Sequence, residues 1–150
     1  MSDYSSRRSM RFSTRSEYGI RVLVRMGRGY GNGPLPLAEL ADQEGLPLSY
    51  LEQIAGQLRR AGLITSRMGV KGGYALARAP EAISMADIVR SLEGSLAPVS
   101  CLAEGAGPGE CTHADTPCSA HAFWEQLQET ITSTLESVSV ADLMKEGQPA

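Results

Sequence analysis

The sequence lacks any long apolar run. No stretch of its 150 residues approaches the roughly 20 apolar residues that a membrane-spanning helix needs. Its first residues, MSDYSSRRSM, carry charge but no apolar core of the kind found in secretory signals. We therefore expect a cytoplasmic protein that has no membrane partner.

The sequence also lacks the side-chain patterns of common enzymes. It has no phosphate-binding glycine loop, no nucleophile with an accompanying base and no pair of carboxylates placed for acid–base chemistry. It contains no internal repeat and no low-complexity tract. These absences predict that the protein is not an enzyme.

Cysteine is scarce and confined to one segment. The three cysteines are Cys101, Cys111 and Cys118, and an odd number in a reducing compartment does not form a disulfide framework. Their separations, nine and six intervening residues, do not fit the C-x2–4-C pairs of zinc fingers. The glycine and proline residues between the cysteines suit a flexible loop that could fold around a metal centre. We interpret them as an iron–sulfur ligand set on a loop at residues 94–118, with simple surface thiols as the alternative.

Charge is divided unevenly along the chain, although the net charge is only −3. Residues 1–78 hold twelve Lys or Arg against six Asp or Glu, whereas residues 79–150 hold two against eleven. A basic half joined to an acidic half suggests a surface for a polyanion, the alternative being chance clustering of solvated charges.

The N-terminal half has the pattern of a DNA-binding domain at residues 10–93. A polar, disordered tail is expected at 1–9, and Met10 is an alternative translation start. Thr14 and Glu17 match a capping box that opens a helix to about Arg28. Two further helices, beginning near Pro36 and spanning about 47–61, flank Gly45 and match a helix-turn-helix, with Leu48 among the residues facing inward.

Two short β-prone runs around a glycine-rich turn follow at residues 63–76, which predicts a hairpin, or wing. A fourth helix begins after Ser84 and ends near Glu93. The last long helix, about 119–138, carries a heptad-like apolar stripe for packing against another helix: Trp124, Leu127, Ile131, Leu135 and Val138. The expected fold is mainly α with a small β wing: a winged helix-turn-helix, a dimerisation helix and C-terminal segment at 119–144, and a tail at 145–150.

The second helix of the helix-turn-helix offers polar side chains in its first turns, where a recognition helix contacts base edges. These candidate DNA-binding residues are Ser49, Tyr50, Glu52 and Gln53. Basic candidates for phosphate or minor-groove contact lie farther along this helix and on the wing: Arg59, Arg60, Arg67 and Lys71. The alternative is a solvated helical module that binds another protein.

The stretch LPLAELADQEGLPLSYLEQIAGQLRRAGLITSRMGVKGGYALAR closely resembles the winged helix of the IscR-type iron–sulfur regulators. MRFSTRSEYGIRVL and CSAHAFWEQL resemble the first helix and the end of the cluster loop of this family, which also includes NsrR-type nitric-oxide sensors and cluster-free repressors. The resemblance implies a homodimer whose long helices cross and whose recognition helices read a near-palindromic operator in double-stranded DNA. The wing departs from the family's Arg-Gly turn, because this chain has Arg67-Met68-Gly69.

Two residues are candidates for the fourth ligand of the cluster. His121 completes a Cys-x-x-His pair that resembles the IscR ligand set and favours a 2Fe–2S cluster, although it could instead be a packed residue of the helix. Glu17 lies where other family members place an acidic ligand from the partner subunit, which would favour a 4Fe–4S cluster and nitric-oxide sensing. His113 does not match the family pattern.

We expect a regulator whose operator affinity follows the state of the cluster, controlling iron–sulfur or redox genes. An NsrR-like repressor that uses Glu17, and a cluster-free regulator that uses thiols or zinc, are the alternatives. An electron carrier is a further alternative, against which the SYLEQ helix and the GGY wing argue.

Overall fold

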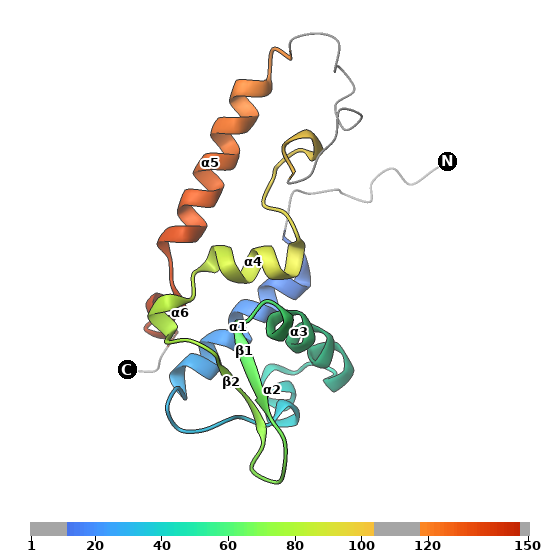
Figure 1. Ribbon diagram of the computed structural model, residues 1–150, viewed down its shortest axis with the longest axis vertical. Coiled ribbons are helices and arrows are strands. Elements are labelled where there is room, and N and C mark those ends of the chain that lie inside the picture. The colour runs from blue at the N-terminus through green and yellow to red at the C-terminus, as the bar shows by residue number, and fades with distance from the viewer. Residues whose placement is uncertain (1–11, 104–117, 148–150) are drawn as a thin grey trace, which may run out of the picture.

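The computed structural model describes residues 12–103 and 118–147 (Figure 1). In chain order they form α1 (Thr14–Arg28), α2 (Leu37–Glu44), α3 (Leu48–Arg60), β1 (Ile64–Arg67), β2 (Gly73–Leu76), η1 (Pro80–Ala82), α4 (Met85–Glu93), η2 (Ser100–Leu102), α5 (His121–Ser137) and α6 (Val140–Met144). The expected tail at 1–9 and most of the expected cluster loop lie outside the described residues.

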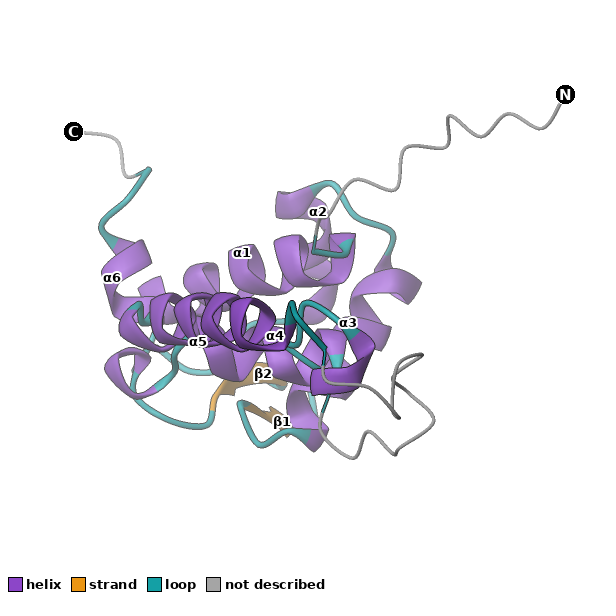
Figure 2. Cartoon of the chain, turned by 90° about the horizontal axis from the view of Figure 1, so that it is seen from above, coloured by secondary structure: helices purple, strands orange, loops and turns teal. Residues whose placement is uncertain are grey.

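The prediction of a mainly helical fold with a small β wing is confirmed. Helices α2 and α3 form the helix-turn-helix, and β1 and β2 pair antiparallel from Ile64↔Leu76 to Arg67↔Gly73. Figure 2 shows the two strands along one side of an otherwise helical body. The turn after α2 depends on Gly45, whose φ of 67° is costly for residues with a side chain.

The wing is joined to the loop between α1 and α2 by a two-way backbone bridge. The N–H of Leu35 donates to the carbonyl of Tyr74, and the N–H of Tyr74 donates to the carbonyl of Leu35, both at 2.8 Å. Gly73 permits this approach, because a Cβ added there would lie 2.2 Å from the carbonyl oxygen of Leu35. The hairpin is therefore held against the body along its second strand.

The predicted capping box at the start of α1 is wrong. Thr14 is the first helical residue, and the residue before it, Ser13, occupies the N-cap position without a side-chain cap. The hydroxyl of Ser13 instead donates to Glu93 on α4 at 2.6 Å. A tertiary contact has replaced the local one, which leaves Glu17 exposed on the first turn without the role that the sequence assigned to it.

The predicted helix after Ser84 is present and has a complete capping box. Ser84 Oγ accepts from the Asp87 N–H at 3.1 Å, and Asp87 Oδ2 accepts from the Ser84 N–H at 3.0 Å. The inward-facing residues of α3 are as expected except for Leu48, which is 42% exposed at the first position of the helix. One core joins the helices and the wing, and its fully buried large side chains include Leu23, Leu40, Leu51, Ile54, Leu58, Leu63, Ile83 and Ile88.

The C-terminal part contains two helices where the sequence indicated one. Helix α5 ends at Ser137, and α6 begins after Ser139, which forms a second capping box with Asp142. Val140 is fully buried against α1, where Gly27 leaves room for it: a Cβ at that glycine would lie 3.0 Å from Cγ1 of Val140. The chain thus returns to the body after α5.

Helix α5 extends away from the rest of the molecule (Figure 1). Its contacts with the body include an ion pair of 3.3 Å between Arg90 on α4 and Glu136. None of its residues is buried, and Trp124, Leu127, Ile131 and Leu135 of the predicted stripe are only partly covered. In the described part of the chain, no helix is long and apolar enough to cross a membrane.

Candidate nucleic-acid interface and cysteine segment

Helix α3 presents a polar face at its N-terminal end. Ser49, Glu52 and Gln53 are exposed there, whereas Leu51 is fully buried and anchors the helix in the core. Serine, glutamate and glutamine side chains can hydrogen-bond base edges in a major groove. Three of the four predicted base-contacting residues therefore lie together on one exposed surface.

Tyr50, the fourth, is partly buried and oriented by α1. Its hydroxyl lies 2.9 Å from Oγ1 of Thr14, and its ring stands edge-on to that of Tyr18 with 6.3 Å between centroids. Both contacts cross from α3 to α1. Tyr50 therefore connects α3 to the first turns of α1.

The predicted basic residues are exposed as well. Arg59 and Arg60 are exposed at the C-terminal end of α3, and Arg67 and Lys71 are exposed on the wing. Nη1 of Arg59 donates to Oγ of Ser66 at 3.4 Å, which connects the end of α3 to β1. Helix and hairpin are thereby presented as one unit.

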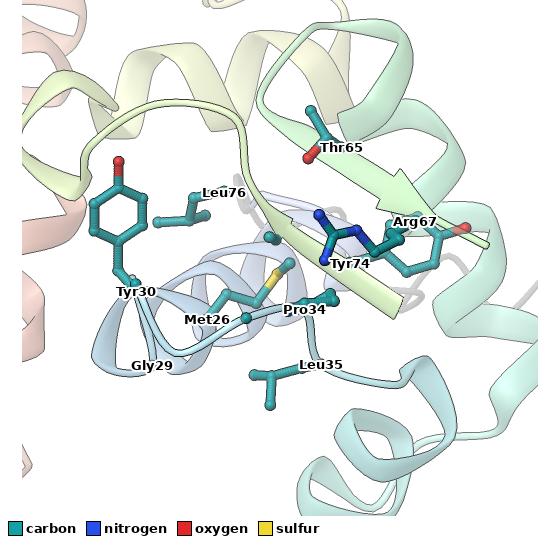
Figure 3. A pocket seen from close by; sticks show the side chains of 12 residues that line it. Met26, Gly29, Tyr30, Pro34, Leu35, Thr65, Arg67, Tyr74 and Leu76 are labelled. Carbon is teal, nitrogen blue, oxygen red and sulfur yellow. The ribbon is translucent and has the colours of Figure 1, made fainter. Parts of the chain in front are cut away.

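Arg67 also lines a cavity of about 260 Å³ below the wing. Figure 3 shows its guanidinium on the cavity side of the hairpin, facing the end of α1 and the loop that carries Tyr30. The other lining side chains are mostly apolar or aromatic and include Met26, Leu35, Tyr74 and Leu76. The Arg67 side chain is exposed to solvent and forms no ion pair with a carboxylate of the described residues.

A hydrogen-bonded group, which we call the Glu93 cluster, joins the start of α1 to the end of α4. It consists of Ser13, Ser16 and Glu93: Oε1 of Glu93 accepts from the Ser13 N–H at 2.7 Å and from the Ser13 and Ser16 hydroxyls at 2.6 Å each. Partial burial acts to raise the pKa of Glu93, but these three hydrogen bonds and the charge of Arg15 outweigh it and lower the pKa. The carboxylate is therefore held in its charged form.

Of the predicted cluster ligands, the structure describes four. Cys101 is partly buried in η2, and Cys118 is exposed shortly before α5; both are free thiols. Cys111, like His113, lies outside the described residues. Cys118 and His121 lie within one turn of each other, because the His121 N–H donates to the carbonyl of Cys118 at 3.3 Å.

The fourth-ligand candidates differ in their surroundings. Nε2 of His121 lies 3.1 Å from Oε1 of Glu125, one turn along α5. Glu17 is exposed on α1 and, within residues 12–103 and 118–147, makes no hydrogen bond or ion pair through its side chain. In that same part of the chain, no three His, Cys, Asp or Glu side chains are gathered in a metal-binding arrangement. The donor types suit an iron–sulfur cluster, but the described residues do not bring them together.

Sequence reasoning missed both the Glu93 cluster and the Thr14–Tyr50 contact. The residues involved are separated by 77 to 80 positions in the first case and by 36 in the second. The only local signal was the Ser-Thr-Arg-Ser run before Glu17, which suggested a helix start and no more. Such contacts depend on how α1 packs against α3 and α4.

Comparison with protein families gives one match that spans most of the chain. The Rrf2 family model, described as "Iron-dependent Transcriptional regulator", matches residues 12–146. The chain is 35% identical over 136 residues to the HTH-type transcriptional regulator IscR of Xenorhabdus nematophila, covering 91% of this chain and 80% of that protein. It is 33% identical over 134 residues to the HTH-type transcriptional regulator CymR of Bacillus subtilis, covering 89% of each.

Solved structures give the same two kinds of relative. The structure of CymR, titled the global cysteine regulator of B. subtilis, matches with a TM-score of 0.74 and 31% identity, covering 93% of this chain and all of that one. The structure of T. potens IscR matches with a TM-score of 0.73 and 31% identity, covering 93% of this chain and 90% of that one.

Proposed function

The chain belongs to the Rrf2 family of iron-dependent transcriptional regulators, and on that premise we propose that it is a cytoplasmic homodimer whose operator affinity is controlled by an iron–sulfur cluster. The observation that carries the DNA-binding part is the exposed polar face of α3, formed by Ser49, Glu52 and Gln53 beside a basic wing. This surface has the residue types that read base edges and phosphates. It has no role in the protein's own core.

Dimerisation through α5 is supported by the state of that helix in the single chain. Trp124, Leu127, Ile131 and Leu135 recur at helical spacing, yet none of them is buried. A second copy of the helix would cover this stripe, because apolar residues at such spacing pack into a facing helix. Two copies of α3 would then read the two halves of a near-palindromic site.

The cluster would be held by Cys101, Cys111 and Cys118, with His121 or Glu17 as the fourth ligand. Thiolates with one imidazole or carboxylate form a suitable donor set, and neither described cysteine is in a disulfide. When bound, such a cluster supplies a centre sensitive to oxidants and nitric oxide. Because Glu17 has no capping role, the structure removes the main argument from the sequence against it as a ligand.

The Glu93 cluster connects the cysteine segment to the DNA-binding face. Glu93 ends α4, and the segment at 94–118 begins with the next residue. The Glu93 carboxylate accepts hydrogen bonds from Ser13 and Ser16. Thr14, in the same turn of α1, is hydrogen-bonded to Tyr50 of α3. Ordering of the segment on cluster binding would fix Glu93 and, through α1, the angle of the recognition helix. Cluster and DNA affinities would then be reciprocally linked.

The test is anaerobic purification followed by visible and resonance spectroscopy and iron and sulfide analysis. Wild type is compared with His121→Ala, Glu17→Ala and the triple variant Cys101→Ala/Cys111→Ala/Cys118→Ala. We expect a coloured wild type, a colourless triple variant and an altered spectrum for the single variant that removes the fourth ligand. Cluster control would be contradicted if cluster-loaded wild type, cluster-free wild type and the triple variant all bound the operator with the same affinity.

The similarity to CymR favours a second candidate, a cluster-free regulator that uses thiols or zinc. In the described segments the cysteines are free and not gathered. A colourless anaerobic sample that contains zinc, or no metal, while still binding its operator would establish this second function in place of the first.

A further inference from the structure

The tip of the wing exposes two apolar side chains. Met68 is 94% exposed and Val70 is fully exposed, more than the other large hydrophobic residues that the structure describes. Neither packs against the body, so neither contributes to the core. Two such side chains are too few to form an apolar patch by themselves, so what they contact has to be judged from the charges and backbone around them.

The turn that carries them is tightly constrained. The N–H of Gly72 donates to the carbonyl of Gly69 at 3.0 Å, and Gly69 has a φ of 106°. A Cβ at Gly72 would lie 2.2 Å from the carbonyl oxygen of Arg67. The two glycines thus allow a compact turn on which Met68 and Val70 are exposed.

The surroundings of the tip are cationic. Arg67 and Lys71 flank the two apolar residues, and the hairpin from Ile64 to Leu76 contains no Asp or Glu. A positively charged ribbon is complementary to a polyanion. Two side chains are also far too small a patch for a stable protein interface, which needs about 800 Å² from each partner.

The hairpin that carries the tip is hydrogen-bonded to α3 and to the loop before α2. Arg59 of α3 donates a hydrogen bond to Ser66 of β1, and the Leu35–Tyr74 backbone bridge holds β2 to the loop before α2. Figure 1 shows the hairpin projecting from the end of the molecule opposite α5, away from the expected dimer helix. When α3 occupies a major groove, a hairpin beside it lies over the neighbouring backbone and minor groove.

We propose that Met68 and Val70 enter the minor groove beside the α3 contact as an apolar wedge, with Arg67 and Lys71 on the flanking phosphates. Apolar side chains are used in this way by proteins that bind the minor groove, where they pack against sugars and partly unstack a base step. The inference rests on the proposed DNA-binding function and adds a second element of recognition to it. It predicts a preference for sites with a readily deformed step under the wing.

The experiment uses duplexes selected from a random library by the wild-type full-length protein, so that every variant is compared on a site that wild type binds. The double variant Met68→Gln/Val70→Thr replaces both side chains with polar ones of similar size. The control, Met68→Leu/Val70→Ile, keeps them apolar, and Lys71→Gln removes one flanking charge. Affinity, its dependence on salt concentration, hydroxyl-radical footprints and the bend angle of the duplex are measured for each.

We expect the polar variant to bind at least tenfold more weakly, since burial of two apolar side chains is lost in each subunit of the dimer. Its salt dependence should be unchanged, its bend smaller and its footprint shorter at the wing position, while the apolar control should match wild type. Lys71→Gln should instead reduce the slope of log affinity against log salt by about two, one for each subunit of the dimer. Equal affinity, bend and footprint for the polar variant and wild type would overturn the wedge. Failure of wild type to select any duplex would overturn the proposed function itself.

Discussion

The hydroxyl of Ser16 donates a hydrogen bond of 2.6 Å to Oε1 of Glu93, although 77 positions separate the two residues in sequence. Ser16 lies in the first turn of α1 and Glu93 is the last residue of α4. The same oxygen also accepts from Ser13. This contact holds the start of the first helix at the point where the cysteine segment begins. Its removal should therefore lower the free energy of unfolding and change how that free energy depends on pH.

Removing the Glu93 carboxylate should destabilise the protein. Glu93→Ala leaves the hydroxyls of Ser13 and Ser16 without their shared acceptor, and we expect a loss of roughly 1.5–3 kcal/mol, the range for hydrogen bonds to a charged group. Urea unfolding followed by circular dichroism measures it. The matched control is Glu81→Ala, an exposed residue of η1, which should leave the midpoint unchanged. Equal urea midpoints for the two variants would show that the Glu93 cluster adds no stability.

Stability should depend on pH through the same group. Because the pKa of Glu93 is lowered below its usual value of 4.5 in the folded protein, its contribution is complete above that value and is lost as the pH falls through the folded pKa. The difference in unfolding free energy between wild type and Glu93→Gln should therefore shrink on acidification below about pH 4.5. A difference that stays constant across this range would mean that the folded and unfolded pKa values are alike.

The hydroxyl of Tyr50 should act through Thr14. Tyr50→Phe and Thr14→Val each remove one side of the same 2.9 Å contact, so each should cost about 1 kcal/mol of stability and the double variant should cost no more than one of them. Both should weaken binding to selected DNA by a similar factor. If Tyr50→Phe alone weakens binding, the hydroxyl contacts DNA directly rather than positioning α3.

The wing should depend on the absence of a side chain at Gly73. Gly73→Ala would place a Cβ against the Leu35 carbonyl and demand a φ of 147°, so we expect a loss of more than about 1 kcal/mol together with weaker DNA binding. Gly33→Ala is the control, because it also has a positive φ but open space around its Cβ position. Comparable losses in both variants would assign the effect to backbone conformation alone, leaving the Leu35–Tyr74 bridge without a special role.

A charge in the α5 stripe should separate the subunits of the proposed dimer. Leu127 is only half-buried in the single chain, so Leu127→Glu should leave the fold intact while placing a carboxylate in the helix pair. Sedimentation should report a monomer, and affinity for a two-half-site duplex should fall at least tenfold, because the second half-site contact is lost. Gln126→Glu, on the exposed side of the same helix, is the control and should behave as wild type.

Much of the DNA-binding half was predictable because its signals are local. Gly45 ends α2, Ser84 with Asp87 starts α4, and the glycines at 69, 72 and 73 mark the hairpin. Each of these depends on a few neighbouring residues, so it can be read without knowing the fold. The expectation failed where a local signal competed with a distant partner, as at Ser13, Thr14 and Glu17.

The sequence by itself determined the helix-turn-helix, the wing and the spacing of the three cysteines, since backbone preferences and apolar periodicity act over a few residues. Only the tertiary structure decided which polar groups meet: Glu93 with Ser13 and Ser16, and Tyr50 with Thr14. It also decided that the chain after α5 returns as α6 to bury Val140 against Gly27. These outcomes follow from the packing of α1 against α3, α4 and α6, and such packing brings together residues whose separation in sequence carries no periodic signal.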